Sequence, residues 1–354
     1  MYDIASQKDD LERAKRLRQE RNAFGSSTIA LCSVSLLLLV SMWLVALTPV
    51  SAAPVAPGKA TVAKTLIYTH TATAANSTGD WTTLDNVVTN DNPNAIVFAT
   101  PNWNPAGTSG VYDNHAIGVW YTGSRWAIFN QDLTAIPNGA SFNVYAFSSS
   151  KDPHIFVHKA TTSNSTGDWT ALNNSLANNS PNAIVLATPN WNPGGVGGVY
   201  DNHAIGVWYT GSKWAIFNQD LTAIPNGASF NVLVFKNSSD GDFVHKATTA
   251  NSVGDWTNIT NGNTDGNPDA LVFATPNWNP GGTGGVYNKH NIGVWYTGSK
   301  WAVFNQDITA IPNGFLQYRH LLLKHTYRSV ARSATNGLTD KIQETGPAQG
   351  PVFL

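Results

Sequence analysis

Charged residues, cysteine and glutamate are scarce in this chain of 354 residues. Lys, Arg, Asp and Glu together make up 12% of it, about half the share of roughly 25% that is usual in soluble domains. The only cysteine is Cys32, which excludes an intrachain disulfide, a cysteine-based zinc site and thiol catalysis in the rest of the chain. No glutamate occurs between Arg21 and Glu344, and this argues against long surface helices.

The charges that are present form no dense patch. The formal net charge is −1, and residues 54–318 hold ten Lys and Arg against fifteen Asp. The tail, residues 319–354, is mildly basic, with five Lys and Arg against two acidic residues. We therefore expect no nucleic-acid partner. What the chain has in abundance is Trp and Gly, thirteen and thirty residues, a composition that favours short strands and tight turns.

The N-terminal region has the features of an export signal. Residues 1–28 are polar and of mixed charge, and we expect them to be cytoplasmic. Residues 29–53 form a hydrophobic segment without charges that ends in the small residues Ser51, Ala52 and Ala53. The segment is typical of a signal peptide, but its apolar run of about 20 residues is also long enough to span a bilayer. Cleavage and a single-pass membrane anchor both remain open, and each predicts an extracellular or cell-surface location.

Self-comparison shows three copies of one unit. The triplet Pro-Asn-Trp at 101–103 recurs at 189–191 and 276–278, with a period of 88 and then 87 residues. Such a period is too long for a propeller blade and suits a small domain. We place β modules at residues 65–150, 154–237 and 242–318, joined by short polar connectors that permit limited reorientation.

Each unit is predicted to be all-β, with about five short strands separated by Gly, Asn and Pro. The segment STGDWTALNN is predicted to contain at most one helical turn. The fold class is therefore three tandem small β-sandwich or barrel modules after an N-terminal hydrophobic export or anchor helix.

One aromatic hairpin recurs in every unit, and its first copy is HAIGVWYTGSRWAIFNQD, residues 115–132. A two-residue loop at Gly123 and Ser124 would pair Tyr121 with Trp126. In that register Trp120 and Phe129 lie on the opposite face, so both faces of the hairpin are apolar.

Two interpretations of the aromatic residues remain open. Trp side chains pack small β cores, and they also form exposed binding faces for sugar rings or apolar surfaces. If they bind, the candidates are Trp103, Trp120, Trp191, Trp208, Trp278 and Trp295. The ligand would be an extracellular carbohydrate or a surface protein.

A histidine and an aspartate bracket each hairpin and complete the set of candidate binding residues. The pairs are His115 with Asp132, His203 with Asp220, and His290 with Asp307. No nucleophile motif accompanies them, so we expect no enzyme activity. The Asn- and Asp-rich loops could supply oxygen ligands for Ca²⁺, but Asp113 and Asp201 are replaced by Asn288 in the third copy. We therefore expect no metal and no other cofactor.

The third copy departs from the repeat after Gly314, where Arg and Leu appear and the pattern stops. The change predicts that the third module lacks its last strand and exposes an unpaired sheet edge. On this basis we expect the third module to be the least stable. Residues 319–354 form either a docking tail or the product of a changed reading frame.

The sequence PNWNPGGVGGVYDNHAIGVWYTGSKWAIFNQD, in the second copy, resembles a domain of unknown function found singly or in tandem in exported, mostly bacterial proteins. The resemblance covers roughly residues 65–318 and implies secretion and modular β structure, without an active site. The leading hypothesis for function is multivalent binding or adhesion at the cell surface. A structural spacer or surface-layer element without a ligand is the second hypothesis, and an extracellular hydrolase is the third.

Overall fold

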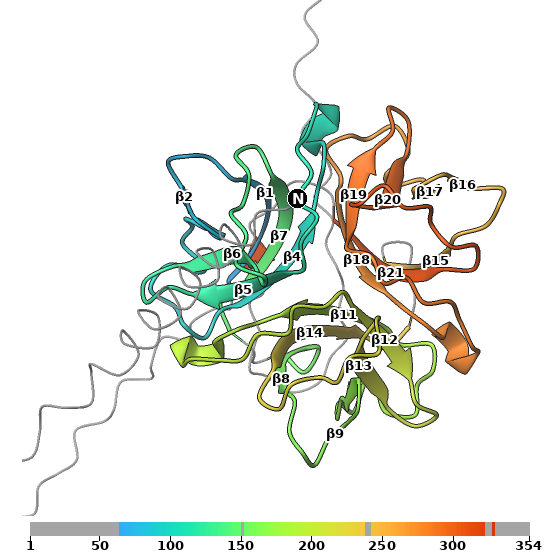
Figure 1. Ribbon diagram of the computed structural model, residues 1–354, viewed down its shortest axis with the longest axis horizontal. Coiled ribbons are helices and arrows are strands. Elements are labelled where there is room, and N and C mark those ends of the chain that lie inside the picture. The colour runs from blue at the N-terminus through green and yellow to red at the C-terminus, as the bar shows by residue number, and fades with distance from the viewer. Residues whose placement is uncertain (1–63, 150–151, 238–241, 323–327, 330–354) are drawn as a thin grey trace, which may run out of the picture.

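The structure is a computed structural model that describes residues 64–149, 152–237, 242–322 and 328–329. These residues form an all-β protein in which three repeated units surround a common centre (Figure 1). The expected export segment, residues 29–53, and most of the tail lie outside the described residues. Among those described, no helix is long and apolar enough to cross a membrane.

Every unit contains seven strands and one short 3-10 turn. The first unit consists of β1 (Lys64–Thr71), β2 (Ser77–Thr78), β3 (Trp81–Thr83), β4 (Ile96–Pro101), η1 (Pro105–Gly107), β5 (Ile117–Tyr121), β6 (Trp126–Asn130) and β7 (Ser141–Phe147). The second consists of β8 (Ile155–Lys159), β9 (Ser165–Thr166), β10 (Trp169–Ala171), β11 (Ile184–Pro189), η2 (Pro193–Gly195), β12 (Ile205–Tyr209), β13 (Trp214–Asn218) and β14 (Ser229–Phe235). The third consists of β15 (Asp242–Lys246), β16 (Ser252–Val253), β17 (Trp256–Asn258), β18 (Leu271–Pro276), η3 (Pro280–Gly282), β19 (Ile292–Tyr296), β20 (Trp301–Asn305) and β21 (Leu316–Leu322).

The strands of a unit form two antiparallel sheets. In the first unit the last strand, β7, lies between β1 and β4, and the short strand β22 (Arg328–Ser329) extends this sheet beside β1. The second sheet has the order β2-β3-β6-β5. The same two sheets recur in the other units as β11-β14-β8 with β12-β13-β10-β9, and β15-β21-β18 with β16-β17-β20-β19. Because the last strand of each unit pairs with its first strand, the two ends of a unit lie side by side in one sheet.

The hairpin prediction is confirmed in detail. Tyr121 pairs with Trp126, and Trp120 lies on the other face opposite Ala127, in the expected register. Gly123 has a positive φ of 109°, as the two-residue loop requires.

Three other expectations were wrong. A unit has seven strands rather than about five, because the segment STGDW forms the two-stranded hairpin β9–β10 instead of a helical turn. The third unit does have its last strand, since β21 pairs with both β15 and β18 despite its altered sequence. The short connectors were expected to permit limited reorientation of the modules, but the modules are joined directly. Parallel bridges join Asn102 to Val294, Val119 to Asn190, and Val207 to Asn277, so the three units close into a ring.

Asparagine side chains fasten the ring at each junction between units, which we call a seam. Asn192 of the second unit accepts a hydrogen bond from the backbone N–H of Tyr121 at 2.6 Å and donates one to its carbonyl at 2.7 Å. Asn104 and Asn279 bind the backbone of Tyr296 and Tyr209 in the same way. Each unit therefore binds the preceding unit of the ring through a side chain that makes the hydrogen bonds of a strand partner.

One cluster of the hydrophobic core contains residues of all three units. Strands β4, β11 and β18 lie closest to the pseudo-threefold axis (Figure 1). Phe98, Leu186 and Phe273, which occupy equivalent positions on these strands, belong to one buried cluster. One layer along, the hydroxyls of Thr100, Thr188 and Thr275 accept hydrogen bonds from backbone N–H groups of the neighbouring strands. A shared core of this kind makes the units interdependent.

Candidate functional site

The predicted tryptophans lie at the seams. Trp120 of the first unit contacts Trp191 of the second edge to face, with ring centroids 6.2 Å apart. Trp81 also packs on Trp120, with ring centroids 5.5 Å apart, and Tyr200 packs on Trp191 at 5.6 Å. Equivalent chains occur at the other seams, formed by Trp169, Trp208, Trp278 and Tyr287, and by Trp256, Trp295, Trp103 and Tyr112.

Two glycines of the repeat make these contacts possible. A Cβ on Gly198 would lie 1.2 Å from the carbonyl oxygen of Trp191, so only glycine allows the two chain segments to approach. A Cβ on Gly118 would lie 2.8 Å from the ring of Phe129, which covers that position and contacts Tyr200 across the seam. The close contacts at the seams thus depend on glycines that recur in the repeated sequence motifs.

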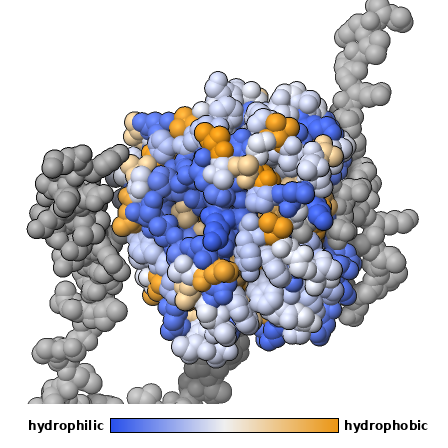
Figure 2. Space-filling model, turned by 45° about the vertical axis from the view of Figure 1, so that its right-hand side comes forward, coloured by the Kyte–Doolittle hydropathy of each residue, from blue (hydrophilic) through white to orange (hydrophobic). Residues whose placement is uncertain are grey.

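Trp103 and Trp120 of the first unit lie at different seams. Trp103 contacts Trp295 of the third unit, whereas Trp120 contacts Trp191 of the second. All six candidate tryptophans are half-buried. Each side chain is therefore partly accessible to solvent, while most of its surface packs against other residues of the protein. Figure 2 shows that hydrophobic residues on the viewed face form small separate patches within a hydrophilic surface.

The three predicted His–Asp pairs are all formed. The distance from His Nδ1 to Asp Oδ2 is 2.6 Å for His115 and Asp132, and the other pairs are as close, at 2.7 Å for His203 with Asp220 and 2.5 Å for His290 with Asp307. The second carboxylate oxygen of Asp132 accepts a hydrogen bond from the backbone N–H of Thr134, which orients the carboxylate.

The second and third carboxylates are held in the ionised form. Burial raises the pKa of Asp220, but the hydrogen bonds from the Thr222 backbone and from His203 outweigh it and hold this pKa below its usual value. The same balance, with Thr309 and His290 as donors, lowers the pKa of Asp307. Each carboxylate thus orients an imidazole whose Nε2 is left for another partner.

The three imidazoles line one depression on the pseudo-threefold axis. Its volume is about 80 Å³, and one His, one Ile, one Thr and one Pro of each unit contribute to its wall. The members from the first unit are Thr100, Pro101, His115 and Ile117. The repeat period shows that these residues are equivalent in the three units, but it does not predict that they converge on one axis.

The loops after the predicted aspartates contain strained aliphatic residues, two of which are exposed and one half-buried. Leu133, Leu221 and Ile308 follow Asp132, Asp220 and Asp307, and their φ angles are 67°, 65° and 64°. This left-handed conformation costs an L-residue other than Gly, Asn or Asp roughly 1–2 kcal/mol. Leu221 and Ile308 are 53% and 64% exposed, so burial does not offset the strain. We call the axial depression together with these three loops the axial face.

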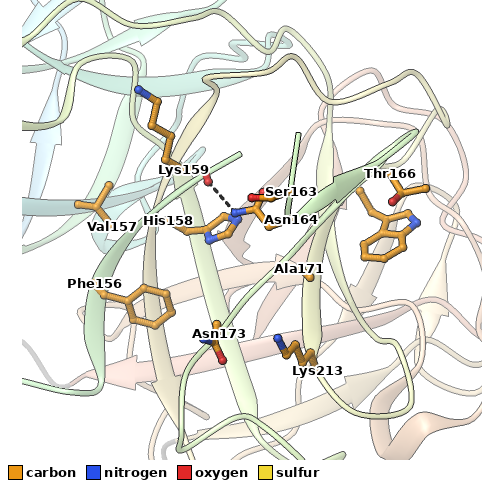
Figure 3. Close-up of a pocket in the computed structure, with 11 residues that line it drawn as sticks. Phe156, Val157, His158, Lys159, Ser163, Asn164, Thr166, Ala171, Asn173 and Lys213 are labelled. Carbon is orange, nitrogen blue, oxygen red and sulfur yellow. Dashed lines mark hydrogen bonds between the residues drawn. The ribbon is translucent and has the colours of Figure 1, made fainter. Parts of the chain in front are cut away.

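A second kind of hollow lies on the side of a unit. In the second unit it has a volume of about 500 Å³ and lies between β8, β9 and β10 (Figure 3). Its floor contains His158, whose Nε2 is 2.7 Å from the hydroxyl of Thr170, and Asn164, whose amide donates to the carbonyl of Lys159. The first unit has an equivalent hollow of about 400 Å³ around His70 and Asn76. We call these the lateral hollows.

Comparison with protein families identifies the repeat. The sequence profile of a domain of unknown function, DUF7452, matches the chain three times, at residues 59–146, 124–234 and 214–317. The chain belongs to the DUF7452 family. The matches confirm the resemblance that the aromatic and asparagine-rich words indicated. A comparison with curated proteins gives no match.

The DUF7452 units bring together only part of a catalytic arrangement. In the described part of the chain, no hydroxyl or thiol is hydrogen-bonded to His115, His203 or His290, which a nucleophile activated by these histidines would need. Over the same residues, no group of three or more His, Cys, Asp or Glu is arranged to hold a metal ion. What the axial face offers is three oriented imidazoles and three aliphatic side chains, two exposed and one half-buried, a combination suited to binding.

Proposed function

We propose that this DUF7452 protein is an exported binding protein that uses its axial face to engage a surface protein or polysaccharide outside the cell. The observation that carries the proposal is the set of aliphatic residues with positive φ, Leu133, Leu221 and Ile308, of which Leu133 is half-buried and the other two are exposed. Glycine would occupy these positions without strain, yet each unit has a large aliphatic side chain there. Strain that the fold does not require is a recurring property of binding sites.

Three equivalent binding groups around one axis favour a multivalent partner. Linked sites raise the apparent affinity about 10²–10⁴-fold when the partner can occupy them together. In a closed ring the spacing of the sites is set by the fold, so the partner must present groups that match it. The aliphatic side chains would supply apolar contact, and the His Nε2 atoms would supply hydrogen bonds.

The location belongs to the same proposal. The uncharged segment Ile29–Val50, followed by small residues, supports export with either cleavage or retention as an anchor. Protease added to intact cells should then digest the DUF7452 units, and the mass of the mature protein would distinguish a cleaved from an anchored form.

A spacer without a ligand is the competing function, and the seams favour it. The three units contain twelve tryptophans, and all of them are buried or half-buried, as expected if they serve to pack the units together. The hydrolase remains a third hypothesis that lacks a nucleophile, and we do not propose enzyme activity.

Replacement of the strained residues of the axial loops distinguishes a binding protein from a spacer. The full chain, purified in detergent, would be applied to arrays of glycans and extracellular proteins beside the triple variant Leu133→Gly/Leu221→Gly/Ile308→Gly. A ligand retained by the wild type and lost by the variant, whose melting temperature is equal or higher, supports binding at the axial face. A wild type that retains nothing, or ligands bound equally by both proteins, supports the spacer.

A further inference from the structure

The lateral hollow of the second unit differs in charge from that of the first unit. Lys159 and Lys213 line it, and no acidic residue does. Figure 3 shows Lys159 and Lys213 on opposite edges of the hollow, with His158 and Asn164 between them. Neither lysine forms an ion pair with another residue of the described chain.

The other two units neutralise the equivalent of Lys213. In the first unit Arg125 forms an ion pair with Asp85 at 3.0 Å. In the third unit Lys300 donates to the Thr260 hydroxyl at 2.7 Å and lies 3.8 Å from Asp265.

Both acidic positions are occupied by amides in the second unit. Asn173 stands where the first unit has Asp85, and Asn178 stands where the third unit has Asp265. The first unit also has Thr71 where the second has Lys159, so its hollow contains a single cation that is already paired. Two amide-for-acid replacements thus leave both lysines of this hollow without an acidic partner. In the third unit Lys246 takes the place of Lys159, but Lys300 is paired there, so only the second unit combines two unpaired lysines.

We propose that the lateral hollow of the second unit binds an acidic saccharide, a sugar chain whose residues carry carboxylate or sulfate groups. The ammonium groups of Lys159 and Lys213 would bind the acid groups, and the amide of Asn173 would donate to sugar oxygens. The site lies apart from the axial face, since none of the residues that line it lines the axial depression.

Aromatic residues make the hollow suitable for sugar rings rather than for a bare anion. Phe156 and Trp169 are half-buried and line the same space as the lysines. Aromatic rings bury the apolar faces of ligands while keeping their own cost in conformational entropy low. The volume of about 500 Å³ is within the range of roughly 300–1,000 Å³ that small-molecule sites occupy.

Calorimetric titration of the full chain with tetragalacturonate, a sulfated chondroitin tetrasaccharide and maltotetraose tests the proposal. The expected result is one site per chain for at least one acidic tetrasaccharide, weakened by added salt, with no binding of the neutral maltotetraose. The carboxylated and sulfated probes distinguish the two acid groups.

Two variants provide matched controls. Asn173→Asp restores the acid of the first unit, and Lys213→Gln removes the charge. Each should weaken acidic binding about tenfold, the effect of losing one charge-assisted hydrogen bond. Both positions are at the surface, and an unchanged melting temperature would show that the ring is intact.

Four results would overturn the proposal: no binding of either acidic probe, equal binding of maltotetraose, binding that is independent of salt, or unchanged affinity in both variants. The test is independent of the proposed function. The triple glycine variant of the axial loops should bind the acidic tetrasaccharide as the wild type does, even if the axial face has no ligand.

Discussion

Asn288 and Asn305 of the third unit exchange two hydrogen bonds between their side-chain amides, at 2.7 and 3.2 Å. In the first unit Asp113 takes the place of Asn288, and Asn130 takes the place of Asn305. Asn130 Nδ2 donates to Asp113 Oδ1 at 3.0 Å, but Asp113 Oδ2 and Asn130 Oδ1 are buried without a hydrogen-bond partner. Both atoms are acceptors when the carboxylate is ionised, so they cannot bind each other. A second hydrogen bond, from Asp113 to Asn130 Oδ1, requires that Asp113 holds a proton.

Replacing Asp113 by Asn should therefore stabilise the ring at neutral pH. Burial raises the pKa of Asp113, so the stability contributed by its protonated form is present at low pH and lost as the pH rises through the folded-state pKa. An asparagine amide in its place would make both hydrogen bonds at every pH. We expect Asp113→Asn to raise the free energy of unfolding by about 1–3 kcal/mol at pH 8 and by less at pH 4. Urea denaturation at both pH values measures the difference.

The third unit supplies the converse variant. Asn288→Asp should destabilise the ring at pH 8 and have little effect at pH 4, because it creates the incomplete pair that the first unit already has. If Asp113→Asn instead destabilises the protein at pH 8, the ionised carboxylate has a partner such as a cation. The interpretation that Asp113 needs a proton to complete its hydrogen bonds with Asn130 is then wrong.

Acid should weaken the ring through buried histidines. Burial lowers the pKa of His158 from 6.5 to about 4, and that of His70 equally. The unfolded chain takes up these protons below about pH 6.5 whereas the folded chain does not, so stability falls as the pH drops from about 6.5 to 4. Each histidine accounts for up to about 3 kcal/mol over that range. The Thr170 hydroxyl donates to Asn164, and the amide of His158→Gln can still donate to that hydroxyl. This variant should remove the contribution of His158 to the pH dependence of stability, measured in melts at half-unit pH steps. An unchanged slope would mean that His158 is protonated in the folded state.

Relief of strain in the axial loops gives a third expectation. Ile308 is β-branched, exposed and at a φ of 64°, a conformation that glycine adopts freely. Ile308→Gly should raise the free energy of unfolding by up to about 1 kcal/mol, because the gain of roughly 1–2 kcal/mol exceeds the greater entropy of unfolded glycine. Ile308→Val, which keeps the strain, should leave the melting temperature unchanged. A destabilising Ile308→Gly would show that the side chain contributes packing within the molecule, which removes the main support for binding at the axial face.

Local features of this fold could be predicted from the sequence because they depend on near neighbours. Alternation of side chains and a two-residue turn determine the pairing of Tyr121 with Trp126. His115 and Asp132 lie just outside the paired strands β5 and β6 of one hairpin, so their contact follows from the same register. The repeat period likewise located the three units without any knowledge of their contacts.

The ring could not be predicted, because its contacts join residues about 70 or 190 positions apart that no period relates. Asn104, in the first unit, binds the backbone of Tyr296 in the third, and nothing in the word PNWNP distinguishes that role from a turn. The expected loss of the last strand in the third unit failed for a related reason. Backbone pairing with β15 and β18 is available to β21 whatever its side chains, since the hydrogen bonds of a sheet are made by the main chain.

The closed ring changes the expected unfolding behaviour from three modules to one cooperative body. Asn192→Ala removes both hydrogen bonds to the buried backbone of Tyr121, and we expect a loss of about 2–4 kcal/mol. Because every unit supports its neighbours, the loss should shift a single thermal transition of the whole ring rather than release one unit. The exposed Asn226, in a turn of the same unit, provides the control, and Asn226→Ala should leave the melting temperature within about 1 °C of the wild type. Scanning calorimetry would resolve two or three separate transitions if the units were independent, and the third would then melt first, as its altered last strand predicts.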